Sequence, residues 1–308
     1  MKLGFAVKVV GREGLKPRDT RRWQNSPHLS VSLAYLRDIF EYLRSAEIKM
    51  YRMSSELAPY VTHPDLPQFH NQIQDCATEL VATGDIARRD GLRLSFHPGA
   101  YIVLNTPDDR VAFKSVADLN AQAQILDLMA LGPEAVIVTH VGGVYGDPAA
   151  SIRRFVARYL ALPEPTRRRL VLENDERAYT IGDTYTIHQQ TGIRLVFDLL
   201  HFRCHPTPGM TPGQALALAL GTWPGDQTPK IHYSTTRTEM VIGKNGKLRE
   251  SRLSQHADLI NPFEFIDFVR AAQAERDFDV MLECKAQDVA LLRLRRHLAR
   301  LAPDLRCR

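Results

Sequence analysis

Ile-Arg-Leu-Val-Phe-Asp-Leu-Leu-His, residues 193–201, is the stretch that decides the fold of this chain. Residues 193–197 are mostly apolar and include Val and Phe, which predicts a buried strand that ends at Asp198. His201 follows three residues later, so we expect a carboxylate and an imidazole to leave the same strand end. Aspartate oxygen and histidine nitrogen are ligands that zinc, manganese and other divalent metals prefer. One such pair proves little, but an apolar strand followed by a potential ligand recurs along most of the chain.

The composition predicts a globular protein. The 308 residues are 44% hydrophobic and 24% charged, which is enough apolar content for a large core and excludes disorder. We expect neither a membrane span nor a secretory signal, because no apolar run approaches ~20 residues and no small-residue cleavage site follows the first segment. Four scattered cysteines without CxxC spacing fit a reducing compartment, hence the cytoplasm. The net charge of +5 weakly favours anionic partners.

Seven further strand patterns alternate with helical patterns along the chain. The other predicted strands are Lys2–Val10, Ile48–Met53, Leu92–Phe96, Ala135–Thr139, Arg169–Leu172, Pro229–Ile231 and Phe278–Leu282. The predicted helices with clear bounds are Ser30–Ala46, Gln68–Arg89, Asp108–Leu131, Asp147–Leu160, Pro262–Ala274 and Asp288–Leu301. Because composition does not break along the chain, this alternation predicts an α/β protein made of one (β/α)8 TIM barrel over residues 1–308.

Potential metal ligands follow the predicted strands. His97, His140, Glu173, Asp198 with His201, His232 and Glu283 close strands three to eight, and His63 and His256 lie in loops at the same end. A barrel of this type carries its active site at the carboxyl ends of its strands. A single histidine is usually structural, but six of the chain's 11 histidines fall on this rim beside three carboxylates. Nine ligands predict two or three divalent ions, bridged by Glu173 and Glu283.

Clustered divalent ions fit in-line displacement at phosphorus, in which they generate a hydroxide nucleophile and stabilise the leaving oxygen. Sugar isomerisation on the same barrel is the main competing chemistry, although it would more naturally use fewer histidines and more carboxylates.

Two basic segments are the best candidates for phosphate contacts. Residues 12–23 combine several arginines with Trp23. An insertion between the last two strands, residues 234–260, contains a run of cations: Arg237, Lys244, Lys247, Arg249 and Arg252. Solvated loops are the commoner explanation of such runs, so the prediction that Arg249 and Arg252 contact phosphates needs a test.

Six motifs carry a resemblance to a known family. They are Arg52-Met53-Ser54-Ser55, Phe96-His97-Pro98-Gly99, Leu172-Glu173-Asn174-Asp175, Phe197-Asp198, Lys230-Ile231-His232 and Leu282-Glu283-Cys284-Lys285. In this order, over nearly the whole chain, they resemble the signatures of the UV-damage endonucleases, barrel enzymes related to abasic-site endonucleases of the endonuclease IV type. The resemblance implies a DNA repair phosphodiesterase that nicks immediately 5′ of UV photoproducts and some other lesions, leaving a 3′-hydroxyl.

The resemblance also implies a cofactor and partners. It fills all nine ligand positions with the residues named above and implies a cluster of Mn2+-type ions, with Zn2+, Co2+ or Mg2+ as alternatives. It assigns catalytic roles to Glu173, His232 and Lys230, and it implies that Lys230 can be carboxylated, whereas an unmodified strand lysine is the simpler interpretation. The expected partner is damaged double-stranded DNA, bound by a monomer associated with the nucleoid.

Two departures from the family pattern affect the residues expected to touch the lesion. The family often has a Gln-Tyr pair after His-Pro-Gly, but this chain has Ala100-Tyr101. Ala100 cannot hydrogen-bond, whereas Tyr101 keeps an aromatic face able to enter a strained base stack. Phe5 stands where a strand-one tyrosine is common and lacks its hydroxyl. Metal chemistry should survive both changes, while lesion preference should change.

Three alternative functions stay open at the level of sequence. An abasic-site endonuclease or a metal-dependent sugar isomerase would use the same barrel. A protein that holds metal and binds damaged DNA without catalysis would fit the substitutions at Ala100 and Phe5.

Overall fold

A computed structural model describes residues 1–243, 245–272, 276–305 and 307. Its centre is an eight-stranded parallel sheet with the strand order β6-β5-β4-β3-β2-β1-β10-β7. The strands are β1 Leu3–Ala6, β2 Met50–Arg52, β3 Arg93–Phe96, β4 Val136–Thr139, β5 Leu170–Glu173, β6 Arg194–Val196, β7 Lys230–Tyr233 and β10 Asp279–Leu282. The eight predicted strands are therefore confirmed, in chain order around the sheet.

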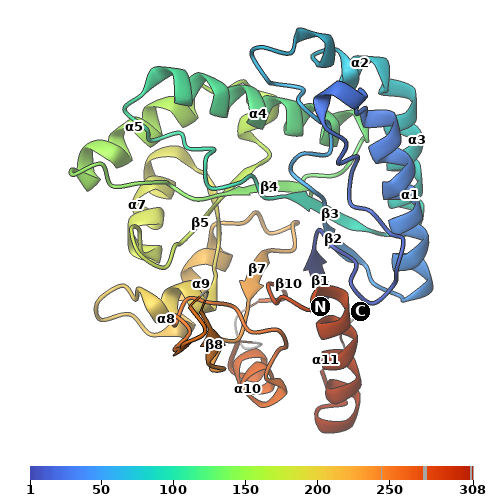
Figure 1. Cartoon of the computed structure of the whole chain (residues 1–308). Helices are drawn as coiled ribbons and strands as arrows, with labels where there is room; N and C mark the ends of the chain where they lie inside the picture. Colours follow the sequence, from blue (N-terminus) through green and yellow to red (C-terminus); the bar gives the residue numbers. More distant parts are fainter. Residues whose placement is uncertain (244, 273–275, 306, 308) are drawn as a thin grey trace.

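The two ends of this sheet meet just beyond β6. Asp198 forms a parallel bridge with His232, and the His232 N–H donates to the Phe197 carbonyl at 2.9 Å. This contact closes the sheet into the predicted TIM-like barrel, which helices surround (Figure 1).

The barrel is covered by helices that follow the strands. The longer ones are α1 Leu29–Ser45, α3 Ala77–Arg89, α4 Asp109–Leu128, α5 Pro148–Ala161, α7 Ile181–Thr191, α9 Pro212–Gly221, α10 Pro262–Ala272 and α11 Gln287–Leu301. The short ones are α2 Gln72–Asp75, α6 Glu164–Arg167, α8 Leu199–Cys204 and the 3-10 turns Trp23–Asn25 and Pro67–Phe69. No helix within the described ranges is long and apolar enough to cross a membrane.

Strand alternation explains how one sequence serves both the core and a polar site. Successive side chains of a strand point to opposite faces, so residues two apart share a face. Leu170 and Leu172 of β5 belong to the large core under the helices, whereas Val171 packs with Val196 and Trp223 in a separate cluster inside the barrel. Glu173, two residues after Val171, consequently faces the barrel interior at its carboxyl end.

The opposite end of the barrel is closed by cations stacked on an indole. The guanidinium groups of Arg93 and Arg194 lie 5.8 and 4.8 Å from the Trp223 ring centroid. Arg93 also pairs with buried Asp279 at 2.9 Å. This plug and the valine layer above it make the barrel a packed core, so chemistry is confined to the carboxyl ends of the strands.

Several element bounds differ from the sequence prediction. β1 ends at Ala6 rather than at Val10, because Val7 adopts a φ of 62°, which strands do not tolerate. The single helix predicted over 68–89 is instead a 3-10 turn, α2 and α3, interrupted at Cys76, whose φ and ψ are −100° and 19°. The last two residues predicted for the helix Pro262–Ala274 lie outside the described residues.

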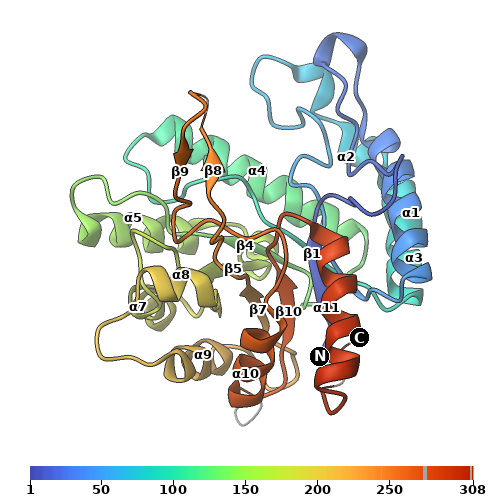
Figure 2. The same ribbon diagram turned by 60° about the horizontal axis from the view of Figure 1, so that its bottom comes forward.

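The insertion after β7 forms a small antiparallel hairpin. Its strands are β8 Val241–Ile242 and β9 Leu248–Arg249. The hairpin stands away from the barrel (Figure 2). Lys244, named above as one of its cations, lies outside the described residues.

Candidate metal centre

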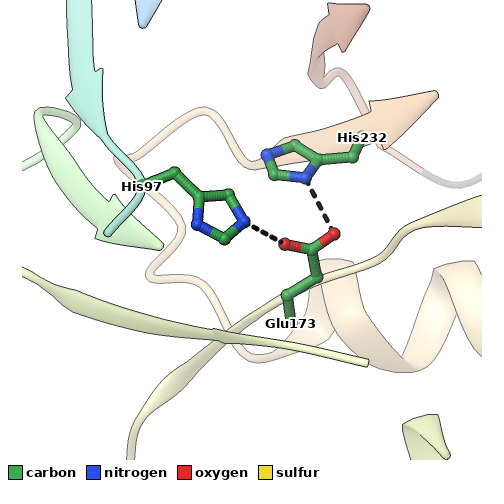
Figure 3. Close-up of side chains that lie close together, drawn as sticks. All are labelled: His97, Glu173 and His232. Carbon is green, nitrogen blue, oxygen red and sulfur yellow. Dashed lines mark hydrogen bonds and ion pairs between the residues drawn. The ribbon is translucent and has the colours of Figure 1, made fainter. Parts of the chain in front are cut away.

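Glu173 stands at the centre of the site, surrounded by imidazoles from four other segments. Its Oε1 lies 2.9 Å from His232 Nδ1, and its Oε2 lies 3.1 Å from His97 Nε2 (Figure 3). His201 Nδ1 lies 3.4 Å from Oε1, and His140 Nε2 lies 3.6 Å from Oε2. Glu173 itself is completely buried. The strand ends thus bring together five of the predicted ligands.

A short helix that the sequence analysis did not predict orients the Asp198–His201 pair. Asp198 is the N-cap of α8, and its Oδ1 accepts the His201 backbone N–H at 2.8 Å. This capping bond satisfies a backbone donor that otherwise has no partner at the start of a helix. Asn174 supports the pair, since its side chain bonds the backbone of Asp198 at 2.9 and 3.1 Å, and its carbonyl lies 3.0 Å from His201 Nδ1.

Glu283 joins the cluster from β10 together with a partner that sequence reasoning missed. Arg52, at the end of β2, forms an ion pair with Glu283, and both side chains are nearly buried. Glu283 Oε1 lies 3.2 Å from His232 Nδ1, and its Oε2 lies 3.9 Å from His256 Nδ1. The sequence held a signal for Arg52 in the alternation of side chains along a strand. Arg52 ends β2 at a position that faces the barrel interior, as the predicted ligands do.

His63 is the predicted ligand that the structure does not bring to the cluster. Among the described residues, its ring is near Tyr60, with 6.1 Å between centroids, and its Nδ1 accepts the Asp65 N–H. It lines a neighbouring cavity of about 340 Å³ together with Tyr101. The other eight predicted ligands form one connected group.

The site holds its central carboxylates in the charged form. Burial raises the pKa of Glu173, but the electrostatic attraction of the surrounding imidazoles, His232 first, and the hydrogen bonds from His201 and His232 outweigh burial and hold that pKa well below its usual range. Burial also opposes ionisation of Glu283, but the charge of Arg52 together with the nearby imidazoles outweighs burial and lowers the pKa. Two carboxylates therefore stay charged at neutral pH inside the barrel mouth.

The imidazoles divide into two kinds. Burial lowers the pKa of His232 to about 4 despite the nearby Glu173 carboxylate, so this ring is neutral at neutral pH. Burial opposes the charged form of His201 as well, but the Asp198 and Glu173 carboxylates outweigh it and raise the pKa to about 11. Asp198, buried beside those other carboxylates, has a raised pKa. A neutral imidazole has the free lone pair that a metal needs.

The donor set fits divalent cations. His232 Nε2, His140 Nδ1 and Asp198 Oδ2 are buried and have no hydrogen-bond partner among the described residues. Such unpartnered polar atoms are costly unless something else satisfies them. Three overlapping sets place one donor atom of each member within 4.8 Å of the others: His97-Glu173-His232, Glu173-Asp198-His201 and Asp198-His232-Glu283. Mixed imidazole and carboxylate donors suit manganese, zinc and related ions.

Lys230, two residues before His232 on β7, is completely buried below this cluster. Its Nζ donates to Ser95 Oγ at 2.9 Å. Burial, with the charges of Arg52 and Arg93, lowers the pKa of its amine well below the usual range. The buried position therefore disfavours the charged form of this amine.

The residues expected to contact DNA have different placements. Ala100 is exposed, and Tyr101 is 55% exposed, with its ring lying over Gly99. Arg249 and Arg252 are exposed on or beside the hairpin. Phe5 is instead fully buried under the helices, where its ring packs edge-on against Tyr51 at 5.3 Å. A direct lesion contact by Phe5 does not fit this position, because β1 alternation turns the side chain away from the barrel mouth.

Sequence comparisons find one family over most of the chain. Residues 24–303 match the family model described as "UV-endonuclease UvdE". A UV DNA damage endonuclease of Bacillus velezensis is 32% identical over 271 residues, covering 86% of this chain and 81% of that protein. A second UV DNA damage endonuclease, from Clostridium perfringens, is 27% identical and covers 95% of this chain and 69% of that protein.

Solved structures give the same result for the fold. A crystal structure of SacUVDE aligns with a TM-score of 0.84 and 29% identity, covering 98% of this chain and 99% of that one. D-Psicose 3-epimerase from Clostridium cellulolyticum H10 aligns with a TM-score of 0.56 at 13% identity, covering 92% of this chain and 85% of that one. The second likeness concerns the barrel alone.

Proposed function

Since this chain belongs to the UV-endonuclease UvdE family, we propose that it is a metal-dependent DNA repair endonuclease. It hydrolyses the phosphodiester bond immediately 5′ of UV photoproducts, and of some other lesions, and leaves a 3′-hydroxyl. The observation that carries this proposal is the buried Glu173 carboxylate with four imidazoles within 3.6 Å of its oxygens. Such a donor set supports hydrolysis of phosphodiesters rather than covalent catalysis by a nucleophilic side chain.

The residues of the cluster have distinct roles in this mechanism. Glu173, Asp198, Glu283 and the histidines around them would hold two or three Mn2+ ions. When bound, such ions lower the pKa of water and stabilise charge on the phosphoryl group and leaving oxygen. Glu173 would hold metal through both of its oxygens, which already face different imidazoles. His232 would be a neutral ligand, and Arg52 keeps Glu283 charged and oriented.

Lys230 acts from below the cluster. A buried amine whose charged form is disfavoured can add carbon dioxide through its nitrogen and release one proton to solvent, and the resulting carbamate would contribute a further oxygen donor two residues before His232. We propose this modification as the role of Lys230, and the intact mass of the purified protein tests it by an increase of one carbon dioxide, lost in acid.

The substrate is damaged duplex DNA, bound by one copy of the chain. Tyr101 follows His97 by four residues on the loop after β3 and offers an exposed aromatic face for the strained stack. Ala100 leaves space where a longer polar side chain would probe the duplex, so we expect lesion preference to depend mainly on Tyr101. Arg249 and Arg252 contact phosphates, and the protein works in the cytoplasm at the nucleoid.

The decisive experiment compares nicking by wild type and Glu173→Gln on duplexes with one defined photodimer, one abasic site or no lesion, each with Mn2+. Glutamine keeps the shape of Glu173 and removes its charge. We expect wild type to nick 5′ of the photodimer and the variant to lose at least about 100-fold of that rate, because the metals supply several kcal/mol to the transition state. Arg44→Gln, on the outside of α1, is the matched control.

Other outcomes select the alternatives. Nicking of the abasic duplex alone identifies an abasic-site endonuclease. Tight binding of the photodimer without any break identifies a binding protein without catalysis. Turnover of a simple ketose without nicking identifies a sugar isomerase, and equal nicking by Glu173→Gln contradicts the role of Glu173.

A further inference from the structure

The hairpin β8–β9 exposes two aliphatic side chains at its tip. Ile242 and Leu248 are 74% and 66% exposed. They are register partners in the antiparallel pair, so both point to the same face of the ribbon. The turn beyond them is tight, since the Gly243 N–H donates to the Lys247 carbonyl at 2.9 Å. The two side chains therefore form a compact apolar knob next to the turn rather than a scattered set of surface residues.

Cations surround this knob. Among the described residues near it, Lys247, Arg249 and Arg252 are exposed, whereas Arg237, at the base of the hairpin, pairs with Glu239 and Asp258. Arg249 pairs across the ribbon with Val241, on the face opposite to Ile242 and Leu248. An apolar edge flanked by exposed arginine and lysine is the pattern of proteins that wedge aliphatic side chains between base steps and hold phosphates on either side.

The base of the hairpin is attached to the metal centre. Thr236 and His256 form an antiparallel bridge there, and His256 Nδ1 lies 3.9 Å from Glu283 Oε2. The Arg237 N–H donates to the Gln255 carbonyl at 2.7 Å, which extends the pairing outward. The hairpin thus rises from the same rim as the candidate ligands and stands clear of the barrel (Figure 2).

We propose that the Ile242–Leu248 pair is an apolar wedge that enters the base stack of the duplex within about six base pairs of the scissile phosphate. This inference rests on the proposed function, because a duplex must lie across the metal centre. Ile242 is the sixth residue after Thr236, so an extended strand carries the wedge at most about 20 Å from the rim. At about 3.4 Å per base step, it reaches roughly six base pairs from the nick.

Charge and position favour DNA over a second copy of this chain as the occupant. A symmetric contact would bring the cations of this hairpin, Lys247, Arg249 and Arg252, close to those of the other copy, and like charges repel. A polyanion is attracted by the same groups. The small size of the exposed pair also suits insertion between two bases better than a stable protein interface, which needs about 800 Å² per partner.

The test uses the full chain with Mn2+ and a duplex that carries one photodimer. The variant Ile242→Ser with Leu248→Ser removes the apolar pair, and Ile242→Val with Leu248→Met keeps it. Leu160→Ser is a matched control, because Leu160 is 47% exposed in the last turn of α5, at the other end of the barrel. Both hairpin positions are exposed, so the variants fold. Affinity is measured by fluorescence anisotropy in a Glu173→Gln background, which keeps the duplex intact.

We expect the double serine variant to bind about 10- to 100-fold more weakly, as the loss of two buried aliphatic groups implies. Its salt dependence should be unchanged, because no charge is removed. A 2-aminopurine base within roughly six base pairs of the nick should become fluorescent with wild-type hairpin and stay quenched with the serine variant. The Val and Met variant and Leu160→Ser should behave as wild type.

Equal affinity and equal 2-aminopurine fluorescence of the serine variant would overturn the wedge. So would sedimentation that shows a dimer of wild type, a monomer of the serine variant and no change in DNA affinity. Failure of the proposed function would give a different result. If the intact hairpin unstacks the base but the otherwise wild-type chain nicks none of the duplexes, the wedge is supported and the endonuclease activity is contradicted.

Discussion

Arg52→Met should destabilise the metal-free protein strongly and the Mn2+-bound protein much less. Arg52 and Glu283 form an ion pair with side chains 11% and 12% exposed. Removing one partner of a buried pair leaves an uncompensated charge and costs about 3–5 kcal/mol. The lower value applies here, because Arg52 Nε is buried without a partner among the described residues, and its loss relieves that penalty.

Metal changes this balance because it supplies positive charge to the same carboxylate. If Mn2+ recovers about 2 kcal/mol of the loss, linkage requires the variant to bind Mn2+ about 30-fold more tightly than wild type. Urea unfolding in EDTA and in saturating Mn2+ measures the two stabilities, and calorimetry measures the affinity. Arg44→Met, which removes an exposed pair with Glu41, is the control and should have little effect under either condition. An equal loss with and without Mn2+ would refute the electrostatic role of Arg52.

Three further predictions concern other parts of the molecule. Replacing both Arg249 and Arg252 by Gln should reduce the slope of log affinity against log salt by about 1.8, at about 0.9 per phosphate contact, and an unchanged slope would exclude these contacts. Asp19→Asn should destabilise the protein at neutral pH. Burial raises the pKa of Asp19, but Arg21 and backbone N–H groups outweigh burial and lower it below the ordinary value of 3.8. The stability that the charged carboxylate contributes is therefore present above pH 3.8 and is lost as the pH falls through the lower folded pKa. A wild-type advantage in urea unfolding that persists in strong acid would contradict it. Lys230→Met should leave the free energy of unfolding within about 1 kcal/mol, since methionine has a similar volume and removes an amine whose charged form burial disfavours, while nicking falls; unchanged nicking would remove Lys230 from the mechanism.

The barrel was predictable because each strand is short, apolar and followed by a helix. For residues 193–201, the strand predicted from the apolar run ends at Asp198, whereas β6 ends at Val196. This difference is within the usual uncertainty of strand ends. What periodicity could not predict was backbone geometry set by single contacts. Val7 leaves the β region, and Val10 and Gly11 beyond it donate to the distant Asp288 carboxylate, which no local pattern reveals.

The site was predicted from the position of each candidate ligand at the end of a predicted strand, and the alternation of side chains along a strand explains why this worked. Side chains two residues beyond inward-facing valines, such as His140 after Val138 and Glu173 after Val171, must point into the barrel mouth. Arg52 obeys the rule too, but guanidinium is not a metal ligand, so a search restricted to ligands passed over it.

The alternation of side chains predicts a facing direction only for residues in a strand or directly after one, and His63 shows why. It lies in the long connection between β2 and α3, where no ladder hydrogen bonds define a facing direction. Its placement depends instead on local turns, with its N–H donating to the Tyr60 carbonyl at 3.0 Å and its own carbonyl near His70 Nε2 at 2.8 Å. His256 is also in a loop, but the bridge to Thr236 anchors it beside β7, and it reaches Glu283. A loop ligand can be predicted from sequence only when pairing of this kind ties it to a strand end.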